Sequence, residues 1–407
     1  MKCRFCQTEL LHVFLDLGTA PPSNAFLNAE QLQHAELYFP LKLFTCHHCF
    51  LVQVDEVQNH AALFNADYVY FSSFSRSWLE HAKSYADEVS TLLNLGSDSL
   101  VVEIASNDGY LLQYFQEMKI PCIGIEPTAG TANAARLKGI ETIERFFGQT
   151  FADELAAERG KADLIIGNNV LAHVPDINDF VSGVAISLKA EGVATFEFPH
   201  IMEMIDNNQF DTVYHEHFSY LSLHTVQRIF AAHGLRLWDV ERLGTHGGSL
   251  RIWACLEHSG RVDSSRAADL LALEKSNGMT HLDYYRKFQD AAESVKNQFL
   301  SFLITQKQAG KKVAAYGAAA KGCTLLNYAG VKTDLLPFVI DASPYKQGKY
   351  LPGSRIPVLD ESALKAETPD FIIILPWNLK AEITGQLAYV RDWGGKLVCA
   401  IPNFEIL

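Results

Sequence analysis

Residues 214–220 read Tyr-His-Glu-His-Phe-Ser-Tyr, so two histidines, one glutamate and two tyrosines stand within seven positions. A histidine suits proton removal because its pKa lies near neutral pH, and a carboxylate beside it can hold its tautomer and stabilise the imidazolium. Proton removal next to a ketone also needs a donor for the developing enolate oxygen. The cluster therefore predicts chemistry at a carbon atom, because oxygen and nitrogen carry lone pairs and often need only positioning.

Within this cluster we assign His217 as the base, with Glu216 or a nearby backbone carbonyl to orient its ring. His215 is the position least expected to face a site. On a strand, His215 and His217 would share one face and Glu216 the other, so Glu216 could serve the fold instead. The plain alternative for the whole cluster is packing at a sheet edge.

The elements that must position this cluster alternate between helices and strands. An amphipathic helix is expected first, over residues 78–95. Alternation of this kind predicts a doubly wound parallel sheet, with ligands at the carboxyl ends of its strands. The expected strands are 100–104, 122–125, 162–167 and 193–198, and the expected helices between them include 111–118 and 129–138.

The first of these strands ends in a turn of small residues, Ala-Ser-Asn-Asp-Gly at 105–109. Glu103 lies within that strand, and Glu126 ends the next one. A close turn can hold the amino-acid tail of an adenosyl group, and a carboxylate can hold its ribose hydroxyls. The dinucleotide pattern GxGxxG is absent, which weakens a nicotinamide interpretation. Together with the run Asn-Asn-Val-Leu-Ala-His at 168–173, these features predict S-adenosylmethionine.

An electrophilic methyl donor beside a carbon-directed base predicts methyl transfer to carbon. Two alternatives stay open, namely a solvated strand-end acid for Glu126 and a purely structural role for Glu103. The residues expected to bind the donor belong to the strand, the turn, the second acid and the later asparagines: Glu103, Ala105, Asn107, Gly109, Tyr110, Leu111, Glu126, Asn168 and Asn169.

Two CxxC pairs stand near the start of the chain, and their four cysteines are Cys3, Cys6, Cys46 and Cys49. A CxxC turn places two thiolates on one side of a tight loop, and two such turns complete a tetrahedral zinc shell. Four thiolates leave no open position for water, so the expected zinc is structural. The 39 residues between the pairs predict a small β-rich lobe with a strand over 41–45. His47 and His48 rank below the cysteines as ligands.

The second half of the chain holds two glycine-rich turns that could contact a phosphate. Residues 243–251 precede a strand and offer backbone N–H groups together with His246 and Arg251. An ordinary hairpin turn is the alternative. Residues 264–308 then read as mostly helical, a connector between domains.

After Gly310 a second α/β unit begins with a strand over 312–316 and a small-residue turn over 317–322. A turn of this kind that enters a helix is a natural diphosphate cradle, with Lys321 as a point charge. The GK[ST] ending of a Walker loop is missing, so ATP hydrolysis is not expected. A later loop offers the ring of Tyr345 for stacking and the charge of Lys346 for a phosphate. An ordinary solvated loop is the alternative. The candidates in this unit are Tyr316, Gly317, Lys321, Tyr345 and Lys346.

Length and composition set outer bounds on these interpretations. With 407 residues, of which 48% are hydrophobic, the chain is expected to form two or three globular domains. A formal charge of −13 argues against nucleic-acid binding. The N-terminus lacks the apolar core of a signal peptide, and no stretch approaches the roughly 18 apolar residues of a membrane helix. We therefore expect a cytoplasmic protein, without membrane or nucleic-acid partners, whose cysteines are reduced or metal-bound.

The motifs resemble those of the deoxysugar C-methyltransferases, and the match covers nearly the whole chain because the four-cysteine lobe and the C-terminal α/β unit resemble the same family. The resemblance implies methyl transfer from S-adenosylmethionine to C3 of a nucleotide-linked 4-keto-6-deoxysugar, carried by dTDP or GDP, through an enediolate. The motifs that carry it are EIASNDGYLL at 103–112, NNVLAHVPD at 168–176, EFPH at 197–200 and YHEHFSYLS at 214–222.

The same resemblance implies which side chains act on the sugar. Tyr214, Glu216 and His217 carry over as a functional trio, together with His173 and Tyr68. We assign Tyr68 and His173 to the C4 oxygen and nearby sugar hydroxyls. Packing of a helix end is the alternative for His173.

The fold implied by the resemblance is α/β: a Rossmann-like class I methyltransferase core, a small zinc-binding lobe before it and a second Rossmann-like domain after it. That last domain is expected to hold the nucleotide sugar. Because the fused domains can enclose the site within one chain, a monomer is expected. The expected boundaries are 1–70 for the lobe, 71–263 for the core, 264–309 for the connector and 310–407 for the C-terminal domain.

Other functions stay open at this point. Methyl transfer to oxygen or nitrogen would show no deuterium exchange at C3 of the substrate without donor turnover. A non-catalytic zinc-containing protein that binds nucleotide sugars would bind the donor without transferring a methyl group. A nicotinamide oxidoreductase is a more distant alternative, which a donor titration would decide. The nucleotide, the amine or hydroxyl at C3 and the stereochemistry at C3 are not legible in the sequence.

Overall fold

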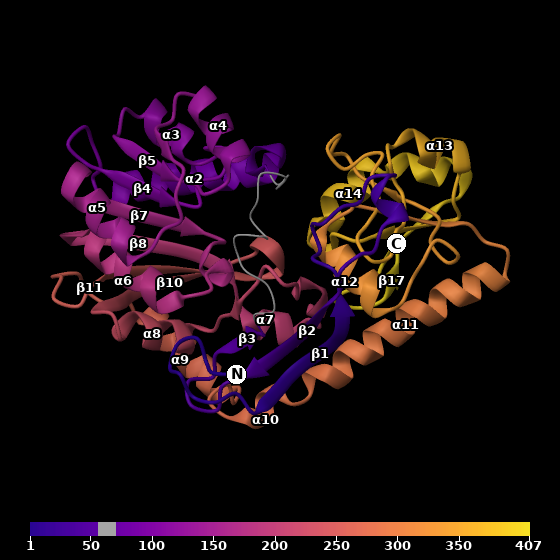
Figure 1. The fold of residues 1–407 in the computed structure, drawn as a ribbon, viewed down its shortest axis with the longest axis horizontal. Helices are drawn as coiled ribbons and strands as arrows, with labels where there is room; N and C mark the ends of the chain where they lie inside the picture. The colour runs from indigo at the N-terminus through magenta and orange to yellow at the C-terminus, as the bar shows by residue number, and fades with distance from the viewer. Residues whose placement is uncertain (56–70) are drawn as a thin grey trace.

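The computed structural model describes residues 1–55 and 71–407, and within them three β-sheets are connected and covered by helices (Figure 1). Tyr68, expected at the site, lies outside the described residues. The seven-stranded sheet and the C-terminal sheet occupy opposite sides of the molecule, and the strands of the N-terminal lobe lie below and between them.

The smallest sheet is antiparallel, in the order β1-β2-β3-β9. Its strands are β1 (His12–Ala20), β2 (Phe39–Thr45), β3 (Val52–Val54) and β9 (Ser219–Tyr220). In β2 every second residue from Leu41 to Thr45 is buried, so the strand predicted over 41–45 is confirmed. The last strand, β9, comes directly after the histidine cluster. The sequence did not predict that this strand would pair with the lobe sheet. The N-terminal lobe and the cluster therefore share a backbone ladder.

The central sheet has seven strands in the order β10-β11-β8-β7-β4-β5-β6, and the five from β8 to β6 are parallel. The α/β core predicted from the sequence is confirmed, with an antiparallel hairpin, β10 and β11, added at one edge. The strands are β4 (Val101–Ile104), β5 (Cys122–Ile125), β6 (Thr142–Ile143), β7 (Ala162–Asn168), β8 (Leu188–Pro199), β10 (Leu235–Leu243) and β11 (Ser249–Leu256).

Helices bury both faces of this sheet, which explains why its parallel strands read as continuous apolar runs. Val101, Leu164 and Ile166 pack with α2 and α3 on one face. Val102 and Ile165 pack with α5, α6 and α8 on the other. The helices are α2 (Arg76–Leu92), α3 (Leu112–Glu117), α4 (Ala129–Leu137), α5 (Gln149–Arg159), α6 (Ile177–Ser187), α7 (Ile201–Asp206) and α8 (Leu223–Ala231).

The C-terminal sheet has the order β14-β13-β12-β15-β16-β17 and is parallel except for β17. Its strands are β12 (Val313–Tyr316), β13 (Val339–Ile340), β14 (Val358–Leu359), β15 (Phe371–Ile374), β16 (Lys396–Cys399) and β17 (Glu405–Ile406). Its helices are α12 (Ala320–Tyr328), α13 (Ser362–Glu367) and α14 (Lys380–Gln386).

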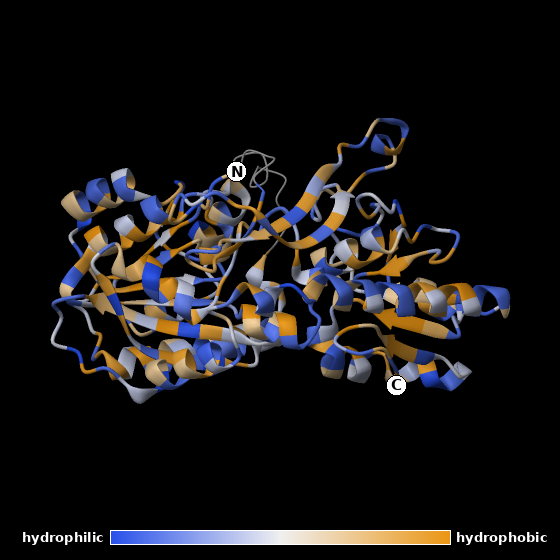
Figure 2. Cartoon of the chain, turned by 90° about the horizontal axis from the view of Figure 1, so that it is seen from below, coloured by the Kyte–Doolittle hydropathy of each residue, from blue (hydrophilic) through white to orange (hydrophobic). Residues whose placement is uncertain are grey.

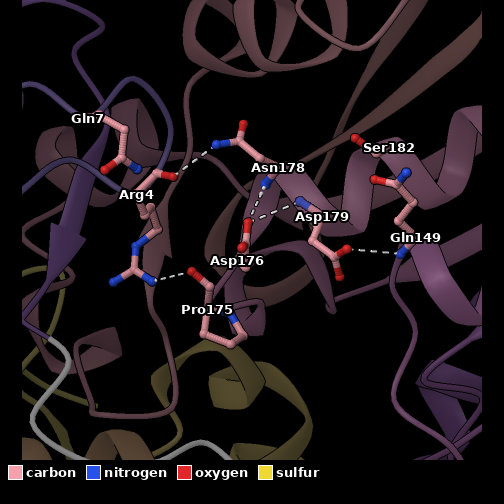
Figure 3. Close-up of a pocket in the computed structure, with 8 residues that line it drawn as sticks. All are labelled: Arg4, Gln7, Gln149, Pro175, Asp176, Asn178, Asp179 and Ser182. Carbon is pink, nitrogen blue, oxygen red and sulfur yellow. Dashed lines mark hydrogen bonds between the residues drawn. The ribbon is translucent and has the colours of Figure 1, made fainter.

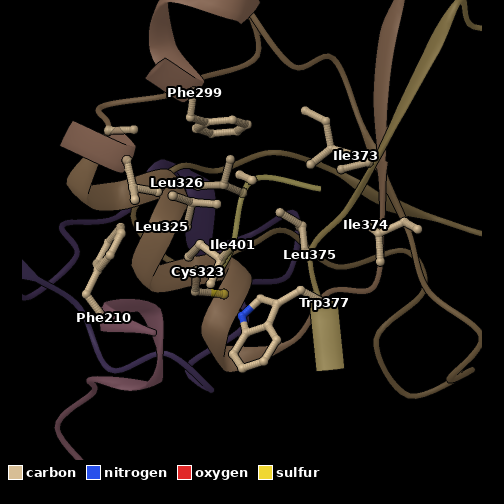
Figure 4. Packing of buried hydrophobic residues seen from close by; sticks show 14 of the residues in the cluster. Phe210, Phe299, Cys323, Leu325, Leu326, Ile373, Ile374, Leu375, Trp377 and Ile401 are labelled. Carbon is tan, nitrogen blue, oxygen red and sulfur yellow. The ribbon is translucent and has the colours of Figure 1, made fainter. Parts of the chain in front are cut away.

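Three helices connect the two larger sheets: α9 (Ser265–Ser276), α10 (Leu282–Tyr285) and α11 (Phe288–Gln308). One continuous apolar cluster runs from β1 through α11 to the C-terminal strands. Within it, Leu325 and Leu326 of α12 lie between Phe210 and the strand residues Ile373 and Ile374 (Figure 4). The lobe is thus packed against the C-terminal sheet as well as the central one.

Hydrophobic residues are concentrated on the strands, whereas the helices carry hydrophilic and hydrophobic residues along their length (Figure 2). α11, with 21 residues, mixes charged side chains such as Lys296 with buried ones such as Phe299. None of the helices in the described ranges combines the length and apolarity needed to cross a membrane. The domain boundaries expected at residues 70, 263 and 309 stay predictions.

Candidate active site

The histidine cluster forms a tight turn that leads into β9. His217 N donates to Tyr214 O at 3.0 Å, and the strand starts only at Ser219. The alternation argued for a strand therefore does not apply to residues 214–217. Hydrogen bonds that fix the turn on the lobe sheet include Val54 N to Phe218 O at 3.1 Å and Tyr214 N to the Tyr220 hydroxyl at 3.3 Å.

His217 is 9% exposed and lies among aromatic rings. Its ring centroid is 4.0 Å from that of Tyr214 and 4.5 Å from that of His173. Burial lowers the pKa of His217 well below its usual value, and the nearby His173 lowers it further, while the backbone of Thr212 opposes both effects. The ring is therefore neutral at neutral pH, which is the form that can accept a proton.

His173 is held by the same turn. It ends the short 3₁₀ helix η3 (Leu171–His173) after β7, and its Nδ1 lies 2.7 Å from Glu216 O. A carbonyl oxygen only accepts, so Nδ1 carries the hydrogen and Nε2 is the acceptor. Burial lowers the pKa of His173 to about 4, so this imidazole is neutral as well.

Glu216 and His215 point toward the lobe. The Glu216 carboxylate, 3% exposed, accepts a hydrogen bond from Asn24 Nδ2 at 2.6 Å, and burial raises its pKa to about 7. His215 Nε2 lies 3.2 Å from Pro40 O. In this arrangement the Glu216 carbonyl orients His173, and within the described residues the Glu216 carboxylate is bonded to Asn24 rather than to His217. Of the described cluster residues, His217, His173 and Tyr214 are those that the structure brings together.

The predicted donor turn lies at the carboxyl edge of the central sheet and has an unusual backbone. Ala105 (φ +57°), Asn107 (φ +49°) and Gly109 (φ +75°) are left-handed, which for a non-glycine residue costs about 1–3 kcal/mol and persists only where surroundings enforce it. Glu126 supplies part of that enforcement, because its carboxylate accepts from Asn107 N and Thr128 N, both at 2.9 Å. The turn and the second acid thus form one unit, as expected for an adenosyl site.

The remaining donor candidates surround this unit. Glu103 is fully buried beside Tyr110, and burial raises its pKa well above the usual range. Asn168 Nδ2 donates to the Tyr110 hydroxyl at 3.4 Å, while the side-chain oxygen of Asn169 has no hydrogen-bond partner within the described residues. Leu111 is fully buried in the core. A buried amide oxygen next to a preformed turn fits a polar ligand such as S-adenosylmethionine.

The Gly109→Ala variant is expected to weaken S-adenosylmethionine binding by about tenfold or more. Besides the left-handed φ, its Cβ would lie 2.3 Å from Ile140 Cδ1 and 3.3 Å from Ala135 Cβ, so the turn would have to shift. Left-handed backbone alone costs about 1–2 kcal/mol. Gly160→Ala is the matched control, because it has φ +83° and nothing within 4 Å of an added Cβ. Calorimetric donor titration and thermal melting would separate the two, and equal donor affinity in both variants would contradict the assignment.

The loop that carries His246 lies beside α2. His246 is left-handed (φ +56°), and its ring meets Trp78 edge-on at 5.2 Å. Thr245 Oγ1 donates to Glu197 Oε1 at 2.7 Å, which fixes this loop to β8. Burial lowers the pKa of His246 to about 4, and its Nδ1 has no hydrogen-bond partner in the described part of the chain.

Arg251 lies deeper, 4% exposed, with its guanidinium 3.1 Å from Glu197 and 3.3 Å from Glu241. His81 Nε2 lies 3.1 Å from the same guanidinium. Two carboxylates therefore already neutralise this charge inside the sheet, and the phosphate role stays a prediction.

The C-terminal candidates separate into two groups. Lys321 and Tyr345 reach the methyltransferase core: the Tyr345 ring stacks on Phe71 at 5.9 Å, and Lys321 is described below. Tyr316 and Gly317 stay within the C-terminal domain, and Lys346 contacts that domain and the N-terminal lobe, where its Nζ lies 5.5 Å from the centroid of the Phe26 ring. Tyr316 donates to Gln386 Oε1 at 3.3 Å, Lys346 Nζ donates to Ala318 O at 2.8 Å, and an added Cβ on Gly317 would lie 2.4 Å from Pro376 Cδ.

Sequence reasoning missed several residues that hold the site together: Asn24, Trp78, Asp211, Trp377 and Asn378. A charged residue three positions before Tyr214 was a local signal for Asp211. The other four had none, because they reach the site from three other segments of the chain.

The four predicted metal ligands come together. The ligand atoms of Cys3, Cys6, Cys46 and Cys49 all lie within 4.8 Å of one another, and among the described residues this is the group that could hold a metal ion. Gln53 Nε2 donates to Cys3 Sγ at 3.2 Å. A closed set of four thiolates with a second hydrogen-bonding shell fits structural zinc.

A polar pocket of about 590 Å³ lies where this zinc knuckle meets α6 (Figure 3). Arg4 crosses the junction, with its guanidinium donating to Pro175 O at 2.8 Å and to Val54 O at 3.0 Å. Pro175 follows His173 by two residues, and Val54 bonds to Phe218. The junction therefore couples the zinc knuckle to both segments that carry the site histidines.

Comparison with known proteins agrees with this architecture. Three family models match in order along the chain: "Putative zinc binding domain" over residues 3–64, "Methyltransferase domain" over 77–240 and "C-methyltransferase C-terminal domain" over 244–402. The C-methyltransferase NovU of Streptomyces niveus is 33% identical over 406 residues, which covers 100% of this chain and 96% of the relative.

Solved structures match part of the chain at low identity. An S-adenosylmethionine-dependent methyltransferase from Clostridium acetobutylicum is 13% identical over 44% of this chain and 92% of its own, with a TM-score of 0.36. The magnesium protoporphyrin IX methyltransferase of Synechocystis PCC 6803 is 14% identical over 49% of this chain and 99% of its own, with a TM-score of 0.35.

The expected cofactors, S-adenosylmethionine and structural zinc, agree with these matches, and a small-molecule substrate follows from the reaction class. The relationship to a C-methyltransferase extends over the full length, and three family models together match most of the chain. The chain therefore belongs to the S-adenosylmethionine-dependent C-methyltransferases with an N-terminal zinc-binding domain.

Proposed function

We propose that this C-methyltransferase adds a methyl group to C3 of a nucleotide-linked 4-keto-6-deoxysugar, with His217 as the base. The observation that supports this most directly is the buried, neutral His217 ring between Tyr214 and His173. A carbon acceptor must lose a proton before it can attack a methyl group, and a neutral imidazole can take it.

S-adenosylmethionine, when bound, supplies an electrophilic methyl group on its sulfonium. The residues suited to hold it are those of the left-handed turn and Glu126. His217 removes the C3 proton, and Tyr214 and His173 lie close enough to its ring to contact the C4 oxygen and a neighbouring hydroxyl. Tyr68, outside the described residues, keeps its proposed place at the same oxygen.

The nucleotide, dTDP or GDP, is proposed to bind the C-terminal domain, where Tyr345 offers an exposed ring beside Phe71. The carboxyl ends of β12 and β15 point to the same side of their parallel sheet, which is where ligands of such sheets bind. The monomeric state and the cytoplasmic location expected from the sequence stay predictions.

The proposal is tested with the full-length zinc-loaded protein, S-adenosylmethionine and a panel of dTDP- and GDP-linked 4-keto-6-deoxysugars. Mass spectrometry is expected to show the gain of one methyl group on at least one of them, and NMR is expected to place it on C3. A C4 ketone acidifies C5 as well as C3, so a methyl group on C5 would keep the base chemistry but contradict the C3 assignment. A methyl group on oxygen or nitrogen would overturn the proposal.

A further inference from the structure

Lys321 lies where the two parallel sheets meet. It stands in the first turn of α12, and its Nζ lies 4.4 Å from the centroid of the Trp377 ring and 2.9 Å from Asn378 Oδ1. Trp377 and Asn378 follow β15, so all three residues belong to the carboxyl edge of the C-terminal sheet. The side chain is only partly exposed.

The same group of side chains is anchored in the methyltransferase core. Trp377 Nε1 donates to Asp211 Oδ2 at 2.8 Å, and Asp211 is fully buried in the short helix η4 (Phe210–Thr212), directly before the catalytic turn. One turn along α12, Thr324 Oγ1 donates to Val213 O at 2.7 Å. On the other side an added Cβ on Gly247 would lie 2.3 Å from the Trp377 ring. Lys321 is thus fixed between the His217 turn and the His246 loop.

The charges around Lys321 are few and can be named. Among the residues that the structure describes, the titratable groups that face it are Asp211 of η4, His217 of the turn and His246 of η5 (Thr245–Gly247). Its positive charge lowers the pKa of both histidines. In residues 1–55 and 71–407, Asn378 is the one hydrogen-bond acceptor for this ammonium group, which has three N–H donors. N–H groups therefore remain for a bound ligand.

The turn before α12, by contrast, already holds a carboxylate. Ala318 N donates to Asp341 Oδ2 at 2.7 Å, and Lys346 Nζ lies 3.6 Å from the same oxygen. An acidic side chain on the backbone N–H groups occupies the position where a diphosphate cradle would need its anion, and it would repel one. The diphosphate role predicted for Lys321 is therefore not the one that its surroundings favour.

We propose that Lys321 is a catalytic residue whose ammonium group contacts the C4 oxygen of the keto-sugar and stabilises the enolate. The assignment rests on the proposed function, because it needs a ketone next to the reacting carbon. As His217 takes the C3 proton, the C–H electron pair forms the C3–C4 double bond and the carbonyl pair moves to the C4 oxygen as negative charge. That pair returns as the C3–CH₃ bond forms, the C4 ketone is restored, and the sulfonium leaves as a neutral thioether.

The Lys321→Met variant of the zinc-loaded full-length protein is expected to lose about 10²- to 10³-fold in kcat, the usual effect of removing an oxyanion donor. Deuterium exchange at C3, measured in D₂O without methyl transfer, is expected to fall in parallel. The Kd for dTDP and GDP, measured by calorimetry, is expected to stay within about threefold of wild type, because the diphosphate is held elsewhere. Lys365→Met, an exposed lysine of α13, is the matched control.

Two outcomes would overturn the assignment. Weaker dTDP and GDP binding, by more than about tenfold (1.4 kcal/mol) with an unchanged kcat at saturating sugar, would return Lys321 to the diphosphate. Unchanged kcat and exchange would remove it from the reaction. Failure of the proposed function is separate and visible in the wild-type protein, as the absence of C3 methylation and of C3 exchange.

Two further variants keep the test decisive if Lys321→Met fails to fold. Burial lowers the pKa of Lys321 to about 8, while Asp211 raises it. The active form is the ammonium, so kcat/KM should fall as the pH rises through about 8. Asp211→Asn should move this alkaline limb to lower pH, and Lys321→Arg should move it to higher pH, since arginine stays protonated. An alkaline limb at the same pH in all three proteins would contradict the proposal.

Discussion

The His217→Asn variant is expected to bind S-adenosylmethionine as wild type does and to lose about 10²- to 10⁴-fold in kcat, the usual contribution of a general base. Asparagine keeps a polar planar group in the space of the ring but cannot take up a proton at neutral pH. The loss corresponds to about 2.7–5.4 kcal/mol of transition-state stabilisation. Steady-state kinetics and a donor titration on the same protein preparation measure the two quantities.

The neighbouring histidine provides the control for this experiment. His215→Asn changes the same side chain two positions away, where the ring contacts Pro40 of the lobe rather than His173. We expect its kcat to stay within about threefold of wild type, although its thermal stability falls because a buried hydrogen bond is lost. Equal loss of turnover in both variants would show that the turn is needed only for folding. Loss of donor binding in His217→Asn would instead make His217 a donor ligand.

The pH dependence of the wild-type enzyme gives the same assignment a second check. Burial lowers the pKa of His217 below its usual value of 6.5, and the neutral ring is the active form. Activity is therefore retained at pH 6.5 and above on this side of the profile, and it is lost as the pH falls through the lowered pKa. The acid limb of the pH profile of kcat/KM should thus lie below pH 6.5. The position of this limb should change in the His217→Asn variant.

Local patterns in the sequence were sufficient for the elements and for the residues that act within one element. The CxxC pairs predicted the thiolate cluster because the spacing itself sets its geometry. The strand 100–104 and the acid Glu126 predicted the donor turn because parallel strands end at one edge. These inferences need only the chain's own periodicity.

What the sequence did not predict depends on contacts between distant segments. The strand interpretation of residues 214–217 failed because pairing of β9 with β3 starts the strand only at Ser219. The charge of Arg251 is taken up by Glu197 and Glu241, which requires the register of β8, β10 and β11. The position of Lys321 next to Trp377 and Asp211 exists only after the two sheets have met, so the pattern of the turn at 317–322 could not indicate it.

The second large effect is expected from the metal site, since Cys46→Ser should abolish stoichiometric zinc binding and lower kcat by about 10²-fold or more. In isolated finger peptides the binding of structural zinc contributes about 10–16 kcal/mol of folding free energy. The free energy of unfolding of a whole domain is of similar size, about 5–15 kcal/mol. The lobe is expected to unfold without it. Metal content by mass spectrometry, thermal melting and turnover are the three measurements.

The expected loss of activity follows from the route by which the lobe holds the turn at residues 214–217. Cys3 accepts from Gln53, and Gln53 pairs with Ser219, two residues after the base. Asn24 of the lobe holds Glu216, whose carbonyl orients His173. A displacement of about 1 Å in a catalytic group can lower the rate by about 10²-fold. A disordered lobe should therefore abolish most of the turnover even though the methyltransferase core stays folded.

Cys122→Ser tests whether this effect belongs to the metal site rather than to the loss of any thiol. Cys122 is partly buried in β5 and lies outside the four-cysteine cluster, so this variant should keep its zinc and its turnover. Donor binding in Cys46→Ser should persist, because the left-handed turn and Glu126 are fixed by the central sheet. If Cys46→Ser lost its zinc but turned over at the wild-type rate, the ladder between β3 and β9 would not be what positions His217. The turn would then have to be held by contacts outside the lobe, such as those of Thr324 with Val213 and of His173 with Glu216.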